Sequence, residues 1–210
     1  MAKVEAGWYE TVEIEGKEVF LVPKVLRNDV IVPLEIVEAR WPFWTPRERV
    51  EFAGAFSRKA ELSDSDQMVV DFLMKNGGSR IWTMIALLVT RCRERDKAVD
   101  FLLSRIKEGV RPLANYYQAV GVLSPSECLP ILRESFLAHR QEVTRHPSLQ
   151  TSGDRFIYLD YLSCAAALLT ITGQEEYRAS LVEMRNHRDD AIRQMALTVV
   201  KESNININAG

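Results

Sequence analysis

The sequence predicts a mostly α-helical protein, a superhelix of about four helical hairpins preceded by a small N-terminal cap with a β-hairpin. Three observations support this fold class. A short motif, Val-Asp-Phe-Leu followed by Met or Leu, occurs at residues 70–74 and again at 99–103, each time within an apolar helical pattern. The period of the apolar residues becomes helical at Thr45. Short loops then separate the helical segments, and repeats of about 20–50 residues are typical of stacked arrays of small units.

Residues 1–44 are predicted to form the cap. Segments 11–14 and 17–22 alternate or run apolar and contain β-branched residues, with a Glu-Gly pair between them that suits a tight turn. This pattern indicates a β-hairpin. A second apolar stretch, 29–38, is interrupted by Pro33, so it is either a further strand or an irregular segment followed by a turn of helix.

Three aromatic side chains lie close together in the sequence at the end of this cap: Trp41, Phe43 and Trp44. If they were exposed, they would form a strong contact point for a partner, because tryptophan offers a large contact area. If they were buried, they would attach the cap to the first helix. Burial is the interpretation that we favour.

Residues 45–203 are predicted to form the helical hairpins. Thr45 is a suitable N-cap, Pro46 suits the first helical position, and the apolar stripe that follows marks the first helix. Apolar residues spaced three and four apart predict the later helices. We expect these at 64–76, 79–93, 95–108, 112–122, 125–143, 154–172, 174–186 and 189–203. Residues 204–210 follow as a polar tail.

Glycines and capping residues separate these helices. Gly77 and Gly78 end one helix, because glycine readily adopts the left-handed conformation that follows a helix, and Ser79 begins the next. The start of that next helix, with Arg80 in its first turn, is a place where an anion could be held weakly.

The last predicted hairpin has Asp189, Ile192, Arg193 and Ala196 at the spacing of an aspartate, an apolar residue, an arginine and a small residue. This pattern resembles the HEAT-repeat family, and the match is clear only in this hairpin. The resemblance implies a HEAT-like α-solenoid, in which Asp189 caps the second helix and Arg193 pairs with an acidic neighbour. A solenoid of armadillo or tetratricopeptide type is the alternative, although the Trp, Gly and Tyr signature of the latter is absent.

The composition limits the possible functions. The chain of 210 residues is 47% hydrophobic and 27% charged and has a formal net charge of −2, so nothing in its bulk charge attracts nucleic acid or anionic membranes. The most apolar run, 156–173, is interrupted by Asp160, and we expect a buried helix there rather than a membrane span. The first residues lack the apolar stretch of a secretory signal, so a cytoplasmic protein is expected.

Neither the cysteines nor the histidines suggest a metal site or a catalytic centre. The three cysteines fall at different places in their predicted helices and include no CxxC pair. The three histidines lie far apart in the sequence, without a nucleophile motif nearby, and no glycine-rich phosphate loop occurs. We therefore expect no catalytic residue, no cofactor and no metal. The cysteines are Cys92, Cys128 and Cys164, and the histidines are His139, His146 and His187.

Two groups of side chains are candidates for a binding surface. The densest basic cluster consists of Arg91, Arg93, Arg95 and Lys97. It could bind phosphate or an acidic partner, although cations near a helix C-terminus can also simply complement its dipole. Aromatic residues with polar tips could line a concave groove, although core packing between repeats is the default interpretation. This second group, to which Arg80 is added, consists of Trp82, Tyr116, Tyr117, Tyr158 and Tyr161.

The expected function is a non-catalytic protein-binding scaffold or adaptor that uses the concave face of the helical array. The partner is expected to be another protein, and neither its identity nor the oligomeric state can be read from the sequence. The alternative is a HEAT-like DNA-binding protein or glycosylase of alkylated bases, with Arg80, Trp82, Asp100 and Tyr117 in its groove. The near-neutral charge argues against this alternative, because duplex binding requires many phosphates to be neutralised.

Overall fold

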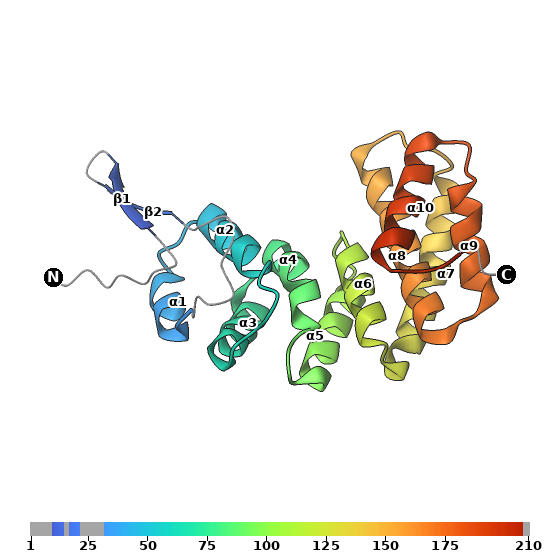
Figure 1. The fold of residues 1–210 in the computed structure, drawn as a ribbon. Coiled ribbons are helices and arrows are strands. Elements are labelled where there is room, and N and C mark those ends of the chain that lie inside the picture. Colours follow the sequence, from blue (N-terminus) through green and yellow to red (C-terminus); the bar gives the residue numbers. More distant parts are fainter. Residues whose placement is uncertain (1–9, 15–16, 22–31, 208–210) are drawn as a thin grey trace. The chain divides into compact units, whose positions relative to one another are not determined.

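The computed structural model describes residues 10–14, 17–21 and 32–207. The chain divides into two compact units, Met1–Glu94 (unit 1) and Arg95–Gly210 (unit 2), which are described separately. Within the described residues the protein is mostly helical, with ten α-helices (Figure 1), which confirms the mostly α-helical character predicted from the sequence. The boundaries predicted at residues 44 and 203 stay predictions.

Two short strands precede the helices of unit 1. Strand β1 (Glu10–Ile14) pairs antiparallel with β2 (Lys17–Leu21), so that Glu10 lies opposite Leu21 and Ile14 opposite Lys17. The two predicted strand segments therefore pair with each other. The turn predicted between them, and residues 22–31, lie outside the described residues.

Four helices complete unit 1: α1 (Leu34–Arg40), α2 (Pro46–Phe56), α3 (Asp64–Asn76) and α4 (Ser79–Val89). Helix α1 packs on α3, and α4 packs on both α2 and α3. Helices α2 and α4 approach closely at Gly54, where an added Cβ would lie 2.9 Å from Cε of Met84. Helix α1 begins directly after Pro33, so the helical alternative for this stretch is the correct one from residue 34.

The segment between α1 and α2 is attached to the core by its tryptophans. Trp41 meets Phe72 edge-on, with ring centroids 5.3 Å apart, and Trp44 lies 5.1 Å from Phe52. Both tryptophans are buried, at 7% and 5% exposure, whereas Phe43 between them is 84% exposed. The expected burial is confirmed for the two tryptophans and is wrong for Phe43, because the turn directs that side chain outward.

Unit 2 contains the six remaining α-helices and one 3-10 turn, η1 (Ser126–Cys128). Helix α8 lies at its centre and packs against α6, α7, α9 and α10. The packing of α6 on α8 is tight at Gly121, where an added Cβ would lie 3.3 Å from Cα of Ala167. The helices are α5 (Arg95–Glu108), α6 (Ala114–Leu123), α7 (Leu129–Arg145), α8 (Ser152–Thr172), α9 (Glu175–Arg185) and α10 (Asp190–Glu202).

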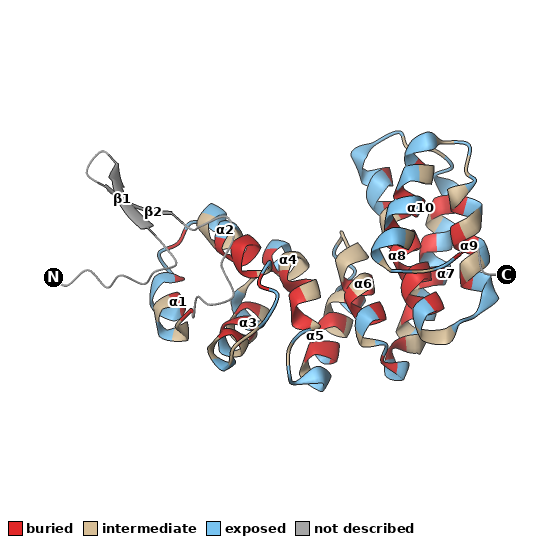
Figure 2. Ribbon diagram, in the orientation of Figure 1, coloured by how far each residue is buried: buried red, intermediate tan, exposed pale blue. Residues whose placement is uncertain are grey.

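Helix α8 is long and apolar enough to cross a membrane by length and composition, and it is the one helix of the described residues of which this is true. Most of its apolar window is nevertheless buried inside unit 2, as the red band through α8 in Figure 2 shows. The expectation of a buried helix in this part of the chain is confirmed.

Several predicted helix boundaries are wrong. The helix expected at 79–93 ends at Val89, and two further boundaries differ for reasons of capping and hydrogen bonding. The helix expected at 125–143 divides into η1 and α7, because Pro130 has no N–H with which to continue one helix through this point. Helix α8 begins two residues earlier than predicted. Thr151 caps it, since its hydroxyl accepts from the N–H of Asp154 and the Asp154 carboxylate accepts from the N–H of Thr151 at 2.7 Å.

The predicted polar tail packs against unit 2 as far as the structure describes it. Asn204 has a positive φ, which allows the N–H of Ile205 to reach the carbonyl of Val200 at 3.1 Å and close helix α10. Arg178 of α9 donates to the carbonyl of Asn206 at 2.7 Å, and Ile207 is buried. Polar composition therefore did not reveal that this segment is anchored.

Candidate functional site

A cavity of about 750 Å³ lies in unit 1 between the N-terminal ends of α2 and α4. We call it the arginine cavity. It is lined by residues 46–47 and 49–51 of α2, and by residues 77–81 at the beginning of α4. The charged side chains of the lining are those of Arg47, Arg49, Arg80 and Glu51. Three arginines against one glutamate give the lining a net positive charge.

The two helices that meet at this cavity begin in different ways. Helix α2 is capped by Thr45, whose hydroxyl accepts from the N–H of Glu48 while the Glu48 carboxylate accepts from the N–H of Thr45 at 2.6 Å. Helix α4 begins after Gly78, with no side-chain cap and no acidic residue in its first turn. Its positive end therefore carries no compensating side chain.

The arginines of the cavity keep their terminal nitrogens unused. Arg49 donates through Nε to the carbonyl of Trp41 at 3.1 Å and lies 5.2 Å from the centroid of the Trp41 ring. Arg47 donates through Nε to Glu51 at 2.8 Å, and this contact raises the pKa of Arg47. Arg80 is exposed and has no side-chain partner among the described residues. Each guanidinium thus retains two NH2 groups that can bind an anion.

The basic cluster predicted from the sequence is organised differently. Arg91 donates through Nη1 to the carbonyl of Lys59, and Arg93 forms an ion pair with Asp64. Arg95 begins unit 2 and donates to the carbonyl of Leu123 at 2.6 Å. All three are exposed, but each has an internal partner, so the structure does not present them together as a free basic patch.

The predicted tyrosine-lined groove is corrected by the structure. The four tyrosines lie in the core of unit 2, with exposures of 0 to 2%, because α8 packs against α6, α7, α9 and α10. The Tyr161 ring stacks on Phe136 of α7, and the Tyr158 hydroxyl donates to the carbonyl of His146 at 2.7 Å. Trp82 in unit 1 is half-buried, and its Nε1 donates to the carbonyl of Leu73 at 3.1 Å. The buried tyrosines are Tyr116, Tyr117, Tyr158 and Tyr161.

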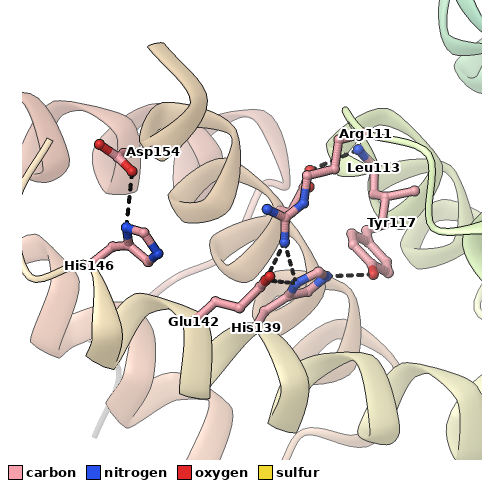
Figure 3. Close-up of polar contacts among 8 residues, drawn as sticks. Arg111, Leu113, Tyr117, His139, Glu142, His146 and Asp154 are labelled. Carbon is pink, nitrogen blue, oxygen red and sulfur yellow. Dashed lines mark hydrogen bonds and ion pairs between the residues drawn. The ribbon is translucent and has the colours of Figure 1, made fainter. Parts of the chain in front are cut away.

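Unit 2 contains a second group of ionisable side chains, of which Arg111, Tyr117, His139 and Glu142 are drawn in Figure 3. Together with Asp160, which pairs with Arg111, we call them the buried cluster. Tyr117, His139 and Asp160 are buried, whereas Arg111 and Glu142 are half-buried. The side chains come from the loop before α6 and from helices α6, α7 and α8. The Tyr117 hydroxyl lies 2.8 Å from Nε2 of His139, and Nδ1 of His139 lies 3.2 Å from the Glu142 carboxylate, which also pairs with Arg111.

Asp160 is the member of the cluster that anchors the start of α6. It is fully buried, and its Oδ1 accepts from the N–H of Leu113 at 2.8 Å while Nε of Arg111 lies 3.2 Å from Oδ2. Burial raises the pKa of Asp160 to about 6, although the backbone hydrogen bond and Arg111 oppose this shift.

The other titratable members of the cluster are shifted as well. Burial lowers the pKa of His139 and raises that of Tyr117. Burial acts to raise the pKa of Glu142, but the hydrogen bonds with His139 and Arg111 outweigh it, so the pKa of Glu142 is lowered. The cluster at neutral pH therefore consists of a neutral tyrosine and a neutral histidine beside paired charges.

The order hydroxyl, imidazole and carboxylate in this cluster resembles that of a nucleophile, a base and an orienting acid. Tyr117 is nevertheless fully buried, so a substrate has no access to its hydroxyl. The described contacts indicate a structural role for the cluster, because they hold the loop before α6 against α7 and α8. Among the described residues no three His, Cys, Asp or Glu side chains lie close enough to hold a metal ion.

The residues that carry the HEAT-like pattern have the local roles that the resemblance implied. Asp189 is the N-cap of α10 and accepts from the N–H of Ala191 at 2.9 Å. Arg193 pairs with Asp190 at 2.8 Å, and Ile192 and Ala196 are fully buried.

Comparison of the chain with protein-family models, with curated proteins and with solved structures finds no match. Membership of the HEAT family therefore stays a prediction that rests on these few positions.

Sequence reasoning identified Arg80 and the helix start beside it, but missed Arg47 and Arg49. The available signal was the arginine-rich first turn after Thr45, which could be read as an exposed helix surface. This first turn of α2 lies opposite the beginning of α4 because α2 packs on α4, and this packing cannot be predicted from the local sequence.

Proposed function

We propose that this protein is a non-catalytic binding scaffold, built from helical hairpins, that recognises another protein. The observation that carries the proposal is the equivalence of the two copies of the repeated motif. Val70 and Leu73 in α3 are fully buried, and so are Val99 and Leu102 at the matching positions of α5, at 3% exposure or less. Equal burial at equal positions is expected of repeated units that stack, and such arrays usually serve as binding surfaces.

In this proposal the hairpins α3–α4, α5–α6, α7–α8 and α9–α10 form a HEAT-like superhelix, and the β1–β2 pair caps its N-terminal end. A rigid array of this kind loses little conformational entropy when a partner binds, so it can present many side chains at once. Arg80, which is exposed, and Trp82, which is half-buried, both lie on α4 and are the members of the predicted groove that are not in the core.

No observation favours the glycosylase alternative. Tyr117, one of the four residues assigned to its groove, is fully buried. The buried cluster that contains it also offers no hydroxyl or imidazole to a substrate from outside. A binding function, unlike catalysis, does not require these buried groups to reach a substrate.

The proposal is tested by affinity capture of partners with the intact, tagged protein from lysate of its source cells, followed by mass spectrometry. Half of the sample is treated with nuclease before elution. A stoichiometric protein partner that persists after nuclease treatment is the expected result. Recovery of nucleic acid alone, or of no stoichiometric partner, would contradict the proposal, and nucleic acid alone would favour the glycosylase alternative.

A further inference from the structure

We infer that the arginine cavity of unit 1 binds an acidic segment of a partner protein, whose aspartate or glutamate carboxylates contact Arg47, Arg49 and Arg80. This inference rests on the proposed function and adds the chemistry of the partner. It differs from the sequence-based expectation, which placed the basic contact at the cluster of Arg91, Arg93 and Arg95.

The charge of the cavity is the first argument. Three arginines line it, against the single carboxylate of Glu51. Glu51 contacts only Nε of Arg47, and the nearby carboxylate of Glu48 is occupied at the cap of α2. An excess of positive charge therefore remains in a concave site, where it attracts a negatively charged group.

The free hydrogen-bonding capacity of the arginines is the second argument. The contacts of Arg47 and Arg49 use Nε alone, and Arg80 has no side-chain partner among the described residues. The terminal NH2 groups of a guanidinium match the two oxygens of a carboxylate in a bidentate contact. Three such groups in one cavity suit a segment with several carboxylates.

Preorganisation of the cavity is the third argument. Arg49 is held by the carbonyl and the ring of the buried Trp41, so its guanidinium needs little further ordering on binding. Gly78 has no atom within 4 Å of the place where a Cβ would stand, so a ligand can approach the backbone at this point. The first turn of α4 has no side-chain cap, so its backbone N–H groups are further hydrogen-bond donors for an anion beside the arginines.

An acidic protein segment fits these features better than a nucleic acid does. Duplex binding depends on many phosphate contacts along a groove, whereas this cavity offers three arginines in about 750 Å³ and the chain as a whole carries a net charge of −2. A volume of this size is typical of sites that enclose a small ligand or a few side chains.

The inference is tested by fluorescence anisotropy with the full chain and a short fluorescein-labelled peptide rich in glutamate. The control peptide has every glutamate replaced by glutamine. We expect the acidic peptide to bind and the control peptide not to bind, with an affinity that falls as salt is added, because the contacts are ionic. Inorganic phosphate and a duplex oligonucleotide serve as competitors, and both are expected to displace the peptide only weakly.

Variants locate the site. The combined change Arg47→Gln and Arg80→Gln should lower the affinity for the acidic peptide by about tenfold or more, since it removes two of the three guanidinium groups. Arg133→Gln, an exposed arginine of α7 outside the cavity, should leave the affinity within about twofold. Circular dichroism verifies that all variants remain folded.

Absence of peptide binding, equal binding by the double variant, or stronger binding of phosphate or duplex would each overturn the inference. The proposed function can be judged separately, by affinity capture with the same double variant. If the double variant captures the partner as well as the intact protein does, the cavity is not its site, although the scaffold function stands. If the intact protein captures no partner, the scaffold function fails.

Discussion

The arginine cavity of unit 1 and the buried cluster of unit 2 contain similar side chains and use them in opposite ways. In the cavity, three arginines keep their terminal nitrogens free and reach solvent. In the cluster, Arg111 pairs with Glu142 and Asp160, and Asp160 is fully buried. Charge content alone therefore does not identify a binding site. What matters is whether the protein itself already satisfies the charged groups.

Unit 1 also has a buried pair of its own, which provides an internal comparison. Lys59 and Asp66 are 0% and 1% exposed, and Nζ of Lys59 lies 2.7 and 2.8 Å from the two carboxylate oxygens. Asp66 additionally accepts from the N–H and the hydroxyl of Ser63. Like the charges of the buried cluster, this pair is satisfied by groups of the protein itself, although it lies in the same unit as the cavity.

The largest expected effect is that of removing one partner from this pair. Lys59→Ala should lower the free energy of unfolding of unit 1 by about 3–5 kcal/mol, because it leaves a buried carboxylate without its countercharge. Urea denaturation followed by tryptophan fluorescence measures this, since all four tryptophans lie in unit 1. Lys75→Ala, at an exposed lysine of α3, should change the value by less than about 0.5 kcal/mol. Equal losses in the two variants would show that the Lys59 pair contributes no more than a surface charge.

The next effect concerns pH and the buried cluster. The pKa of Asp160 is about 6 in the folded protein and about 3.9 in an unfolded chain, so the folded state binds more protons between these values. The stabilisation from this group is fully present below about pH 4 and is lost as the pH rises through 6, an effect on the order of 3 kcal/mol. Asp160→Asn should abolish this loss.

The measurement compares the unfolding free energies of Asp160→Asn and the parent protein from pH 4 to 7. The unfolding free energy of the variant minus that of the parent should increase up to about pH 6 and then stay constant. The lowered pKa values of His139 and Glu142 act in the opposite direction, because their stabilisation is lost as the pH falls, and the difference between the two proteins largely removes their contribution. A difference that does not vary with pH would show that Asp160 is not shifted in this way.

The smallest expected changes in stability are those of replacing one arginine in each region. Arg111→Gln should destabilise unit 2 by about 1–3 kcal/mol, since Glu142 and the buried Asp160 lose their common partner. Arg80→Gln should change the stability of unit 1 by less than about 0.5 kcal/mol. Far-UV circular dichroism follows both units during denaturation, with tryptophan fluorescence as the reference for unit 1. A large loss in Arg80→Gln would mean that this side chain supports the fold and is not reserved for a ligand.

Much of the helical structure could be predicted from the sequence. The starts expected at residues 64, 79 and 95 are those observed, because serine and glycine before a helix and apolar residues at spacings of three and four are local signals. One boundary was wrong where a group distant in the sequence intervenes. Helix α6 begins after Leu113 and not at Pro112, and the N–H of Leu113 is bound by Asp160 of α8.

The candidate site could be predicted only in part. Arg80 and the glycines before it were visible as a helix start that could attract an anion. The tyrosines looked like a polar-tipped groove, since their spacing does not distinguish a buried face from an exposed one. The packing of α8 against α6, α7, α9 and α10 placed them in the core. Arg91, Arg93 and Arg95 looked like a patch, since sequence does not show which backbone carbonyls and carboxylates they reach.

The sequence alone was enough to predict the mostly α-helical character and several helix starts, because these depend on interactions between residues a few positions apart. Only the tertiary structure decided which charged groups are satisfied internally and which remain free. Such pairing depends on segments distant in the chain, as with Arg91 and Lys59 or Leu113 and Asp160. In the same way, the arginine cavity exists only because α2 packs on α4 and brings two helix starts together.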